Sequence, residues 1–153
     1  MKTLKILFVC HGNICRSPMA ESVMAYLLRQ NGMDSYVQVA SAATSTEEIG
    51  NPVHHGTVNI LKRHSIPLVP HRAVQMRRDD YGKYDYIIGM DQWNEQNILR
   101  ILGGDSEGKV YSLLDFSLHP RAIADPWYTG DFVSTYNDIT EGCEALLRKI
   151  KEA

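Results

Sequence analysis

A cysteine and an arginine with five residues between them stand near the start of the chain, where the segment 10–17 reads C-H-G-N-I-C-R-S. A thiolate is a strong nucleophile, and a guanidinium is a planar fork of donors that can bind two oxygens of a phosphoryl group at once. A helix N-terminus and a nearby cation both favour the thiolate form of a cysteine. The pattern therefore predicts nucleophilic attack on a bound oxyanion, with Cys10 as the nucleophile and Arg16 as the oxyanion ligand.

The backbone of this segment is expected to bind the same oxyanion. A loop that curls around a tetrahedral anion can aim successive N–H groups at it, and a following helix adds the positive end of its dipole. Gly12 is expected to allow close backbone approach and unusual dihedral angles. Ser17 either donates a hydrogen bond to the sulfur of Cys10 or only caps the helix, and both uses are compatible. The residues expected to bind phosphate are His11, Gly12, Asn13, Ile14, Cys15, Arg16 and Ser17.

The elements that must position this segment are typical of an α/β domain. Lys5 to Cys10 is a nearly continuous apolar run, the pattern of a central strand covered on both faces. Strands that alternate with helices predict a three-layer, doubly wound, four-stranded parallel sheet with helices on both faces. Ligands of such sheets bind beyond the carboxyl ends of the strands, where the segment after the first strand must lie. The other expected strands are 37–43, 84–90 and 109–113. The first expected helix starts at 17–18 and stops at 31–32, and the other expected helices span 52–64, 92–102 and 132–150.

Length and composition limit the class of protein. A chain of 153 residues that is 44% hydrophobic and 22% charged is typical of one globular domain, here residues 1–153. A net charge of −2 gives no large positive field for binding nucleic acid or an anionic membrane. Residues 4–10 are too few to span a bilayer and lack the features of a signal peptide, so the cytoplasm is the expected compartment.

The three cysteines are expected to be reduced thiols. An odd number of cysteines in a chain without a secretion signal does not fit a structural disulfide framework. The spacing of Cys10 and Cys15 is not that of zinc ligands, and His54 and His55 are adjacent instead of one helical turn apart, so no metal site is expected. Cys143 falls on the apolar face of the last expected helix and is interpreted as a core residue.

The segment 10–17 resembles the signature C-x-G-N-x-C-R-S of the low-molecular-weight protein tyrosine phosphatases, which it matches at every fixed position. The resemblance extends through the segments 41–43, 71–73, 90–94 and 125–128 and so covers nearly the whole chain. It implies hydrolysis of phosphotyrosine and aryl phosphates through a phosphocysteine intermediate, without a metal or organic cofactor. It also implies phosphotyrosine-containing proteins as substrates, inorganic phosphate as product and inhibitor, no nucleic-acid or membrane partner, and a monomer or weak dimer.

Expelling a tyrosine oxygen from phosphorus is easier when an acid protonates it, so a carboxylic acid must reach the leaving group. Asp125 is the candidate, followed by Pro126 and two aromatic residues in the extended stretch 116–130. Asp-Pro alone favours only the start of a turn. The resemblance places the general acid at Asp125 and implies that the same carboxylate later activates the attacking water.

The resemblance also implies supporting roles for residues that carry little signal alone. Asn13, Ser17, Ser41 and His71 match positions that form a hydrogen-bond network holding the phosphate loop in its curled shape. Cys15 either forms a reversible disulfide with Cys10 under oxidation, as the resemblance implies, or is simply a second buried thiol, and both interpretations stay open.

The expected wall of the substrate pocket differs from that of the better-known animal enzymes. They often place an aromatic residue shortly after the segment matched by 41–43, whereas this chain has Glu47 and Glu48. Trp127 stands where tyrosine is common, and Tyr128 follows it. Two carboxylates at the rim are expected to disfavour acidic residues beside a phosphotyrosine.

Three alternatives are weighed against this function. Arginine phosphatases are similar throughout the loop but resemble this motif with threonine in place of Ile14. Thioredoxin-coupled arsenate reductases need a further cysteine pair, and this chain has only Cys143 after Cys15. Cysteine phosphocarriers lack the loop arginine and the downstream acid, so Arg16 and Asp125 favour turnover over storage.

Overall fold

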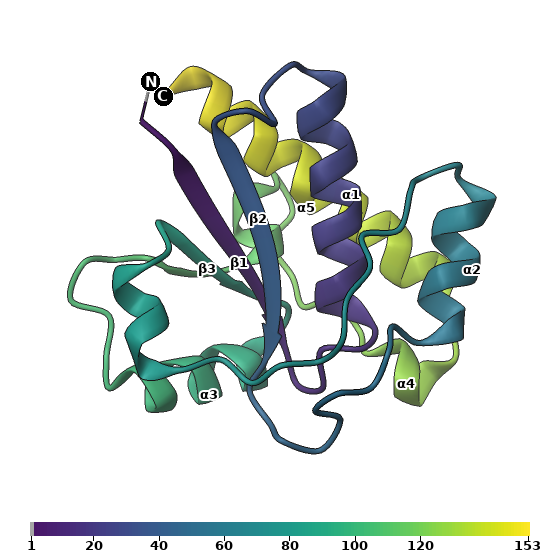
Figure 1. Cartoon of the computed structure of the whole chain (residues 1–153), viewed down its shortest axis with the longest axis horizontal. Coiled ribbons are helices and arrows are strands. Elements are labelled where there is room, and N and C mark those ends of the chain that lie inside the picture. Colours follow the sequence, from purple (N-terminus) through teal and green to yellow (C-terminus); the bar gives the residue numbers. More distant parts are fainter. Residues whose placement is uncertain (1) are drawn as a thin grey trace.

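The chain folds as a four-stranded parallel sheet between two layers of helices, shown in Figure 1 as a computed structural model that describes residues 2–153. All three strand pairs are parallel, and the strand order is β2-β1-β3-β4. The expected fold class is therefore confirmed. The strands are β1 (Leu4–Cys10), β2 (Val37–Ala43), β3 (Tyr86–Gly89) and β4 (Val110–Ser112).

Helices cover both faces of the sheet because both faces of β1 are apolar. Ile6 and Phe8 point into a core shared with α1 and α5, whereas Leu7 and Val9 point into a core shared with α3. This alternation explains why β1 has a continuous apolar sequence. The helices are α1 (Arg16–Gln30), α2 (His55–Arg63), α3 (Gln92–Leu102), α4 (Pro126–Thr129) and α5 (Phe132–Glu152), with short 3₁₀ helices η1 (Arg78–Gly82) and η2 (Leu113–Phe116).

The strand order creates a crevice at the carboxyl ends of β1 and β3. From β1 the chain passes to β2 on one side, and then returns to β3 on the other side of β1. The helices that follow β1 and β3, which are α1 and α3, therefore lie on opposite faces of the sheet (Figure 1). Such a switch point is where doubly wound sheets bind ligands. The loop after Cys10 lies in this crevice, at the lower end of the view in Figure 1.

Several expected boundaries were wrong by a few residues. The second helix starts at His55 and not at position 52, because Pro52 pairs with Arg72 in an isolated bridge and the ring of His54 caps the helix by accepting from the N–H of Gly56. The stretch 116–130 includes the short helix α4. Val133, expected on the inner face of the last helix, is 47% exposed.

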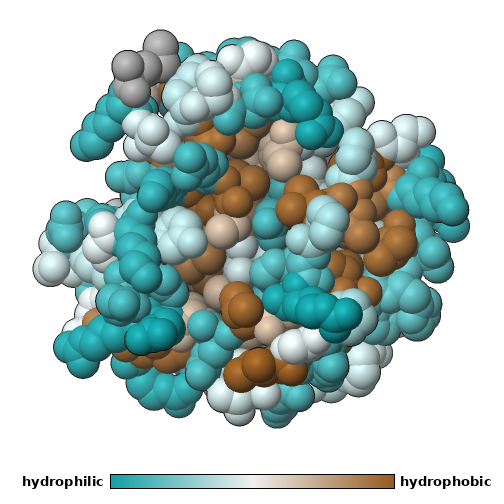
Figure 2. Space-filling view, viewed as in Figure 1, coloured by the Kyte–Doolittle hydropathy of each residue, from teal (hydrophilic) through white to brown (hydrophobic). Residues whose placement is uncertain are grey.

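The surface seen in Figure 2 is mostly hydrophilic at its rim, with a hydrophobic area beside α2. A shallow groove lies there, lined mainly by Pro52, Val53, Val58, Leu68 and Pro70. No helix within residues 2–153 is long and apolar enough to cross a membrane.

Candidate active site

The loop between β1 and α1 turns sharply because Asn13 adopts a left-handed backbone conformation, with φ of 60°. Asparagine tolerates this region better than most residues. Gly12 has no positive φ, so the expectation that Gly12 supplies the unusual dihedral angles was wrong. A Cβ atom on Gly12 would lie 3.4 Å from Cγ of Glu48, an ordinary contact distance.

The sulfur of Cys10 is buried beneath this loop and is surrounded by donors. The backbone N–H groups of Asn13 and Ser17 lie 3.3 Å and 3.4 Å from Sγ, and the hydroxyl of Ser17 lies 3.1 Å from it. Because the Ser17 hydroxyl accepts from Nδ2 of Asn13 at 2.8 Å, its hydrogen is free to point at the sulfur. These donors stabilise an anionic sulfur.

Ser17 does not cap α1, so that alternative use of its hydroxyl was wrong. The helix begins at Arg16, its N-cap is Cys15, and the cap makes no side-chain hydrogen bond. The N-terminus of α1 is therefore left open toward the loop, where an anion can bind.

Arg16 is buried, with 2% of its surface exposed, and three acceptors hold its guanidinium. Nη1 donates to Oδ2 of Asp91 at 2.7 Å and to the carbonyl of Ile123 at 2.8 Å, and Nη2 lies 3.5 Å from Oδ2 of Asp125. Burial disfavours the charged guanidinium, but attraction to Cys10 and to the two carboxylates outweighs it and raises the pKa of Arg16. The positive charge is thus permanent at the site.

Asp91 contacts Arg16, a relationship that the sequence did not reveal. It caps α3, since its Oδ1 accepts from the N–H of Asn94 at 2.8 Å. Its second oxygen binds Arg16. An aspartate at the carboxyl end of the strand beside β1 was the available signal.

Asn13 joins the loop to three other parts of the chain. Its Nδ2 donates to Ser17 and, at 3.0 Å, to Oγ of Ser41, while its Oδ1 accepts from the N–H of Val74 at 3.1 Å. Nε2 of His71 lies 2.6 Å from the same Oδ1, so Nε2 carries the hydrogen. The four residues expected to form the supporting network are therefore joined through Asn13.

Glu21 belongs to this network, and the sequence analysis missed it. Its buried carboxyl accepts from Oγ of Ser41 at 2.5 Å and lies 3.9 Å from Nδ1 of His71. Burial raises the pKa of Glu21 against the effect of the Ser41 hydrogen bond, and burial lowers the pKa of His71. The helical spacing of positions 17 and 21, which places both on one face of α1, was the available signal.

Asp125 is both a helix cap and a wall of the pocket. Its Oδ1 accepts from the N–H of Trp127 at 3.1 Å at the start of α4, and its Oδ2 faces Arg16. The preceding chain is held on two sides, since the N–H of Ile123 donates to the carbonyl of Met90 and the carbonyl of Ala124 accepts from Thr135. The turn that Asp-Pro favours and a place on the wall of the pocket are thus combined in one residue.

One hollow brings Cys10 and Asp125 together with the expected pocket residues, and Arg16 lines the hollow beside it. Glu47 contacts His11, with 2.8 Å between the carboxylate and Nε2. Trp127 and Tyr128 form an aromatic rim and are 55% and 82% exposed, and the side chain of Asp125 beside them is 24% exposed. The lining residues are Cys10, His11, Gly12, Ile14, Cys15, Glu47, Glu48, Asp125, Trp127 and Tyr128.

The other two cysteines differ from Cys10 in their surroundings. Burial and the proximity of Cys10 raise the pKa of the Cys15 thiol to about 12. Burial also raises the pKa of Cys143, which packs in the core beside α1 as expected. Within residues 2–153, no three His, Cys, Asp or Glu side chains lie close enough together to hold a metal ion.

The fold and the site together define the class of the protein, a cysteine-dependent phosphatase with an anion-binding loop at the switch point of an α/β sheet. Comparison with known proteins then gives the family. A model of the family described as "Low molecular weight phosphotyrosine protein phosphatase" matches residues 5–153, and the chain belongs to that family.

Curated relatives and solved structures agree with this assignment. The low molecular weight protein-tyrosine-phosphatase YfkJ of Bacillus subtilis is 37% identical over 97% of both chains. Its crystal structure aligns with a TM-score of 0.95 at 36% identity, over 99% of this chain and 97% of that one. The low molecular weight protein-tyrosine-phosphatase PtpA of Staphylococcus epidermidis is 37% identical over 94% of this chain and 92% of its own.

One structural neighbour is named for a different activity. The crystal structure of DARP, a Drosophila arginine phosphatase, aligns with a TM-score of 0.88 at 27% identity, over 97% of this chain and 98% of that one. The fold alone therefore does not separate the two substrate classes.

Proposed function

We propose that this enzyme hydrolyses phosphotyrosine in proteins, and aryl phosphates, through a phosphocysteine intermediate on Cys10. The observation that carries the proposal is the joint placement of a donor-surrounded sulfur and a charged, buried Arg16 on one loop, with the carboxyl of Asp125 on the wall of the same hollow. The relatives YfkJ and PtpA are named protein-tyrosine-phosphatases, which supports tyrosine as the phosphorylated residue.

In the first step the Cys10 thiolate attacks phosphorus and forms a P–S bond. The bond from phosphorus to the tyrosine oxygen breaks, its electron pair stays on that oxygen, and Asp125 donates the proton. Arg16 and the loop N–H groups bind the phosphoryl oxygens while negative charge spreads over them.

In the second step water attacks the phosphocysteine, and Asp125 accepts a proton from that water. The P–S bond breaks and its electron pair returns to sulfur, where the hydroxyl of Ser17 and the N–H of Asn13 stabilise it. Inorganic phosphate is released and, because it fits the same loop, acts as a competitive inhibitor. The contacts of Asn13 with Ser41 and His71 hold the loop in shape throughout.

Arginine phosphatase is the second candidate because of the likeness to DARP. The feature that favours tyrosine is Ile14, an apolar side chain on the wall of the catalytic hollow, where an aromatic ring can pack. A pair of peptides that differ only in carrying phosphotyrosine or phosphoarginine distinguishes the two, and we expect faster release of phosphate from the phosphotyrosine peptide.

A direct test uses p-nitrophenyl phosphate without any other reagent. We expect sustained release of nitrophenolate from the wild type, and none from Cys10→Ser or Arg16→Ala. Arg16→Lys keeps the charge but loses the planar fork, so its activity should also fall steeply. A single stoichiometric burst without further turnover would support a phosphocarrier instead.

The expected compartment and the expected disulfide between Cys10 and Cys15 both depend on the oxidation state of the Cys10 thiol. A cysteine nucleophile must stay reduced, which supports the cytoplasm as the compartment. Because Cys10 and Cys15 line one hollow, an oxidised Cys10 can be trapped as a reversible disulfide with Cys15. Peptide mapping after treatment with peroxide would detect a Cys10–Cys15 bridge.

A further inference from the structure

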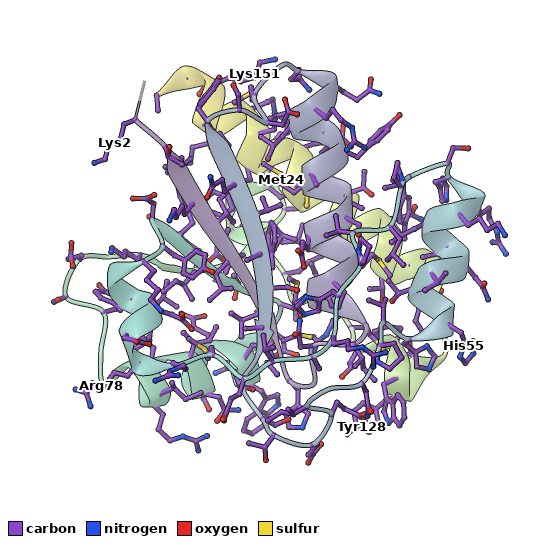
Figure 3. All side chains as sticks on the ribbon, in the orientation of Figure 1. Lys2, Met24, His55, Arg78, Tyr128 and Lys151 are labelled. Atoms are coloured by element: carbon purple, nitrogen blue, oxygen red, sulfur yellow. The ribbon has the colours of Figure 1, made fainter. Side chains whose placement is uncertain are left out.

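A second hollow adjoins the catalytic one on the side of α3. Its walls include Trp93 and Asn97 from α3 and Tyr128 from α4, and the Arg16–Asp91 ion pair forms part of its lining. The hollow measures about 780 Å³, including the part open to solvent, and so is large enough for a side chain. Tyr128 is labelled in Figure 3 at the lower end of the molecule, beside the loops at the carboxyl ends of the strands.

The two hollows are continuous. His11, Asp125 and Tyr128 line both of them, so a chain that leaves the catalytic hollow past these residues enters the second one directly. Successive residues of an extended peptide advance by about 3.3–3.6 Å. A residue one to three positions from a bound phosphotyrosine is therefore within reach of the second hollow.

The chemistry of the second hollow suits an apolar or aromatic group. Trp93 is 72% exposed and Tyr128 is 82% exposed, so two large aromatic surfaces face solvent. The positive charge of Arg16 is paired with the carboxylates of Asp91 and Asp125, which line the same hollow, and Asn97 is uncharged. The two glutamates of the catalytic rim, Glu47 and Glu48, line only the other hollow.

The exposure of Trp93 has no explanation in the packing of the protein. Among residues 2–153, no aromatic ring pairs with that of Trp93, and its side chain belongs to neither main core. Tryptophan and tyrosine are among the residue types that contribute most to binding at protein interfaces.

We propose that the second hollow binds an apolar or aromatic side chain that flanks the phosphotyrosine of a protein substrate, and that Trp93 determines this preference. The inference rests on the proposed function and adds a sequence requirement to it. Trp93 acts as a binding platform for the substrate and takes no part in the bond-breaking steps.

The test measures kcat/KM for phosphotyrosine peptides in which leucine, phenylalanine or alanine occupies one flanking position, scanned over the three positions on each side. We expect the wild type to favour leucine or phenylalanine over alanine by about tenfold at one position. Trp93→Ala should bring this ratio close to one, and Trp93→Phe should retain part of it.

Leu118→Ala is the matched control. Leu118 is an apolar side chain with 93% exposure that lines neither hollow, and the ratio should keep its wild-type value in this variant. A wild type without any flanking preference, or a Trp93→Ala variant that keeps the preference, overturns the proposal. If the wild type hydrolyses neither p-nitrophenyl phosphate nor any of the peptides, the proposed function itself is overturned, and this specificity with it.

Discussion

Asp91 divides its two carboxylate oxygens between Arg16 and the N-terminus of α3. Oδ2 accepts from Nη1 of Arg16 at 2.7 Å, and Oδ1 accepts from the N–H of Asn94 at 2.8 Å. One side chain thus joins the first residue of α1 to the end of β3, across the crevice that holds the phosphate loop. The orientation of the guanidinium depends on this link, since Arg16 itself is buried and cannot be held by solvent.

Asp91→Asn should therefore lower kcat/KM for p-nitrophenyl phosphate. Asparagine can still cap α3, but it no longer offers a charged acceptor to Arg16. We expect a loss of about tenfold to a hundredfold, the range for one charge-assisted hydrogen bond. Asp131→Asn is the control, because Asp131 caps α5 through the N–H of Ser134 and has no contact with Arg16. Equal losses in both variants would mean that the charge of Asp91 is irrelevant to Arg16.

Asp125→Ala should slow poor leaving groups far more than good ones. Without the acid, the oxygen of phenyl phosphate departs as an unprotonated phenolate, whereas nitrophenolate needs little help. We expect a loss of about two to four powers of ten for phenyl phosphate and a much smaller one for p-nitrophenyl phosphate.

Asp125→Asn separates acid chemistry from structure. Asparagine can accept the hydrogen bond from Trp127 and so keep the cap of α4, but it cannot supply the proton. The same dependence on leaving group is expected for both variants. Equal losses for the two substrates would contradict the assignment of Asp125 as the general acid.

Features of the fold that depend on neighbours in sequence were predicted well. The bounds of α3 were predicted without error, because Asp91 caps its start and Gly103 ends it with a positive φ of 76°. The third strand was predicted as 84–90 but pairs only over Tyr86–Gly89, because the length of a central strand is set by its partners β1 and β4. No local signal encodes that length.

In the site, too, residues that are neighbours in the sequence were predicted better than residues that only the fold brings together. The loop from Cys10 to Arg16 is one short segment, so its residue types and spacing carried most of the information. Glu21, Asp91 and Trp93 escaped detection as site residues because their neighbours in the fold are distant in the sequence, as with Arg16 and Asp91, which are 75 positions apart. Their roles follow from the strand order and from the faces of α1 and α3, which only the folded chain defines.

Iodoacetamide should distinguish the three cysteines at pH 7. Cys10 has donors around its sulfur and opens to the catalytic hollow, so it should react first and be protected by phosphate. Cys15 should stay unmodified because its pKa of about 12 leaves almost no thiolate, and Cys143 should stay unmodified because it is buried in the core. Peptide mass spectrometry measures the labelling, and urea-unfolded protein serves as the control in which all three react. Labelling of Cys15 at the rate of Cys10 would refute this assignment.

Glu141 should make the stability of the fold depend on pH in the acidic range. Its carboxylate accepts from Nη1 and Nη2 of Arg121, at 3.0 Å each, and from the hydroxyl of Ser117. These hydrogen bonds lower the pKa of Glu141 from 4.5 to about 2. A carboxyl whose pKa is lower in the folded than in the unfolded chain stabilises the fold above its unfolded pKa, and this contribution is lost as the pH falls toward the folded value.

Glu141→Gln should therefore reduce the free energy of unfolding at pH 6 and have little effect at pH 2, as measured by urea denaturation. High salt should weaken the difference at pH 6, because the pair is partly exposed. Glu144→Gln is the control on the same helix, since Glu144 has no ion pair among residues 2–153.

The contact between Glu141 and Arg121 also anchors the loop that leads to Ile123, whose carbonyl accepts from Arg16. The loss of stability at low pH should therefore be accompanied by faster hydrogen exchange in that loop. If the free energies of unfolding of the wild type and Glu141→Gln differ by the same amount at pH 6 and at pH 2, the charge of the Glu141 carboxylate does not stabilise this loop.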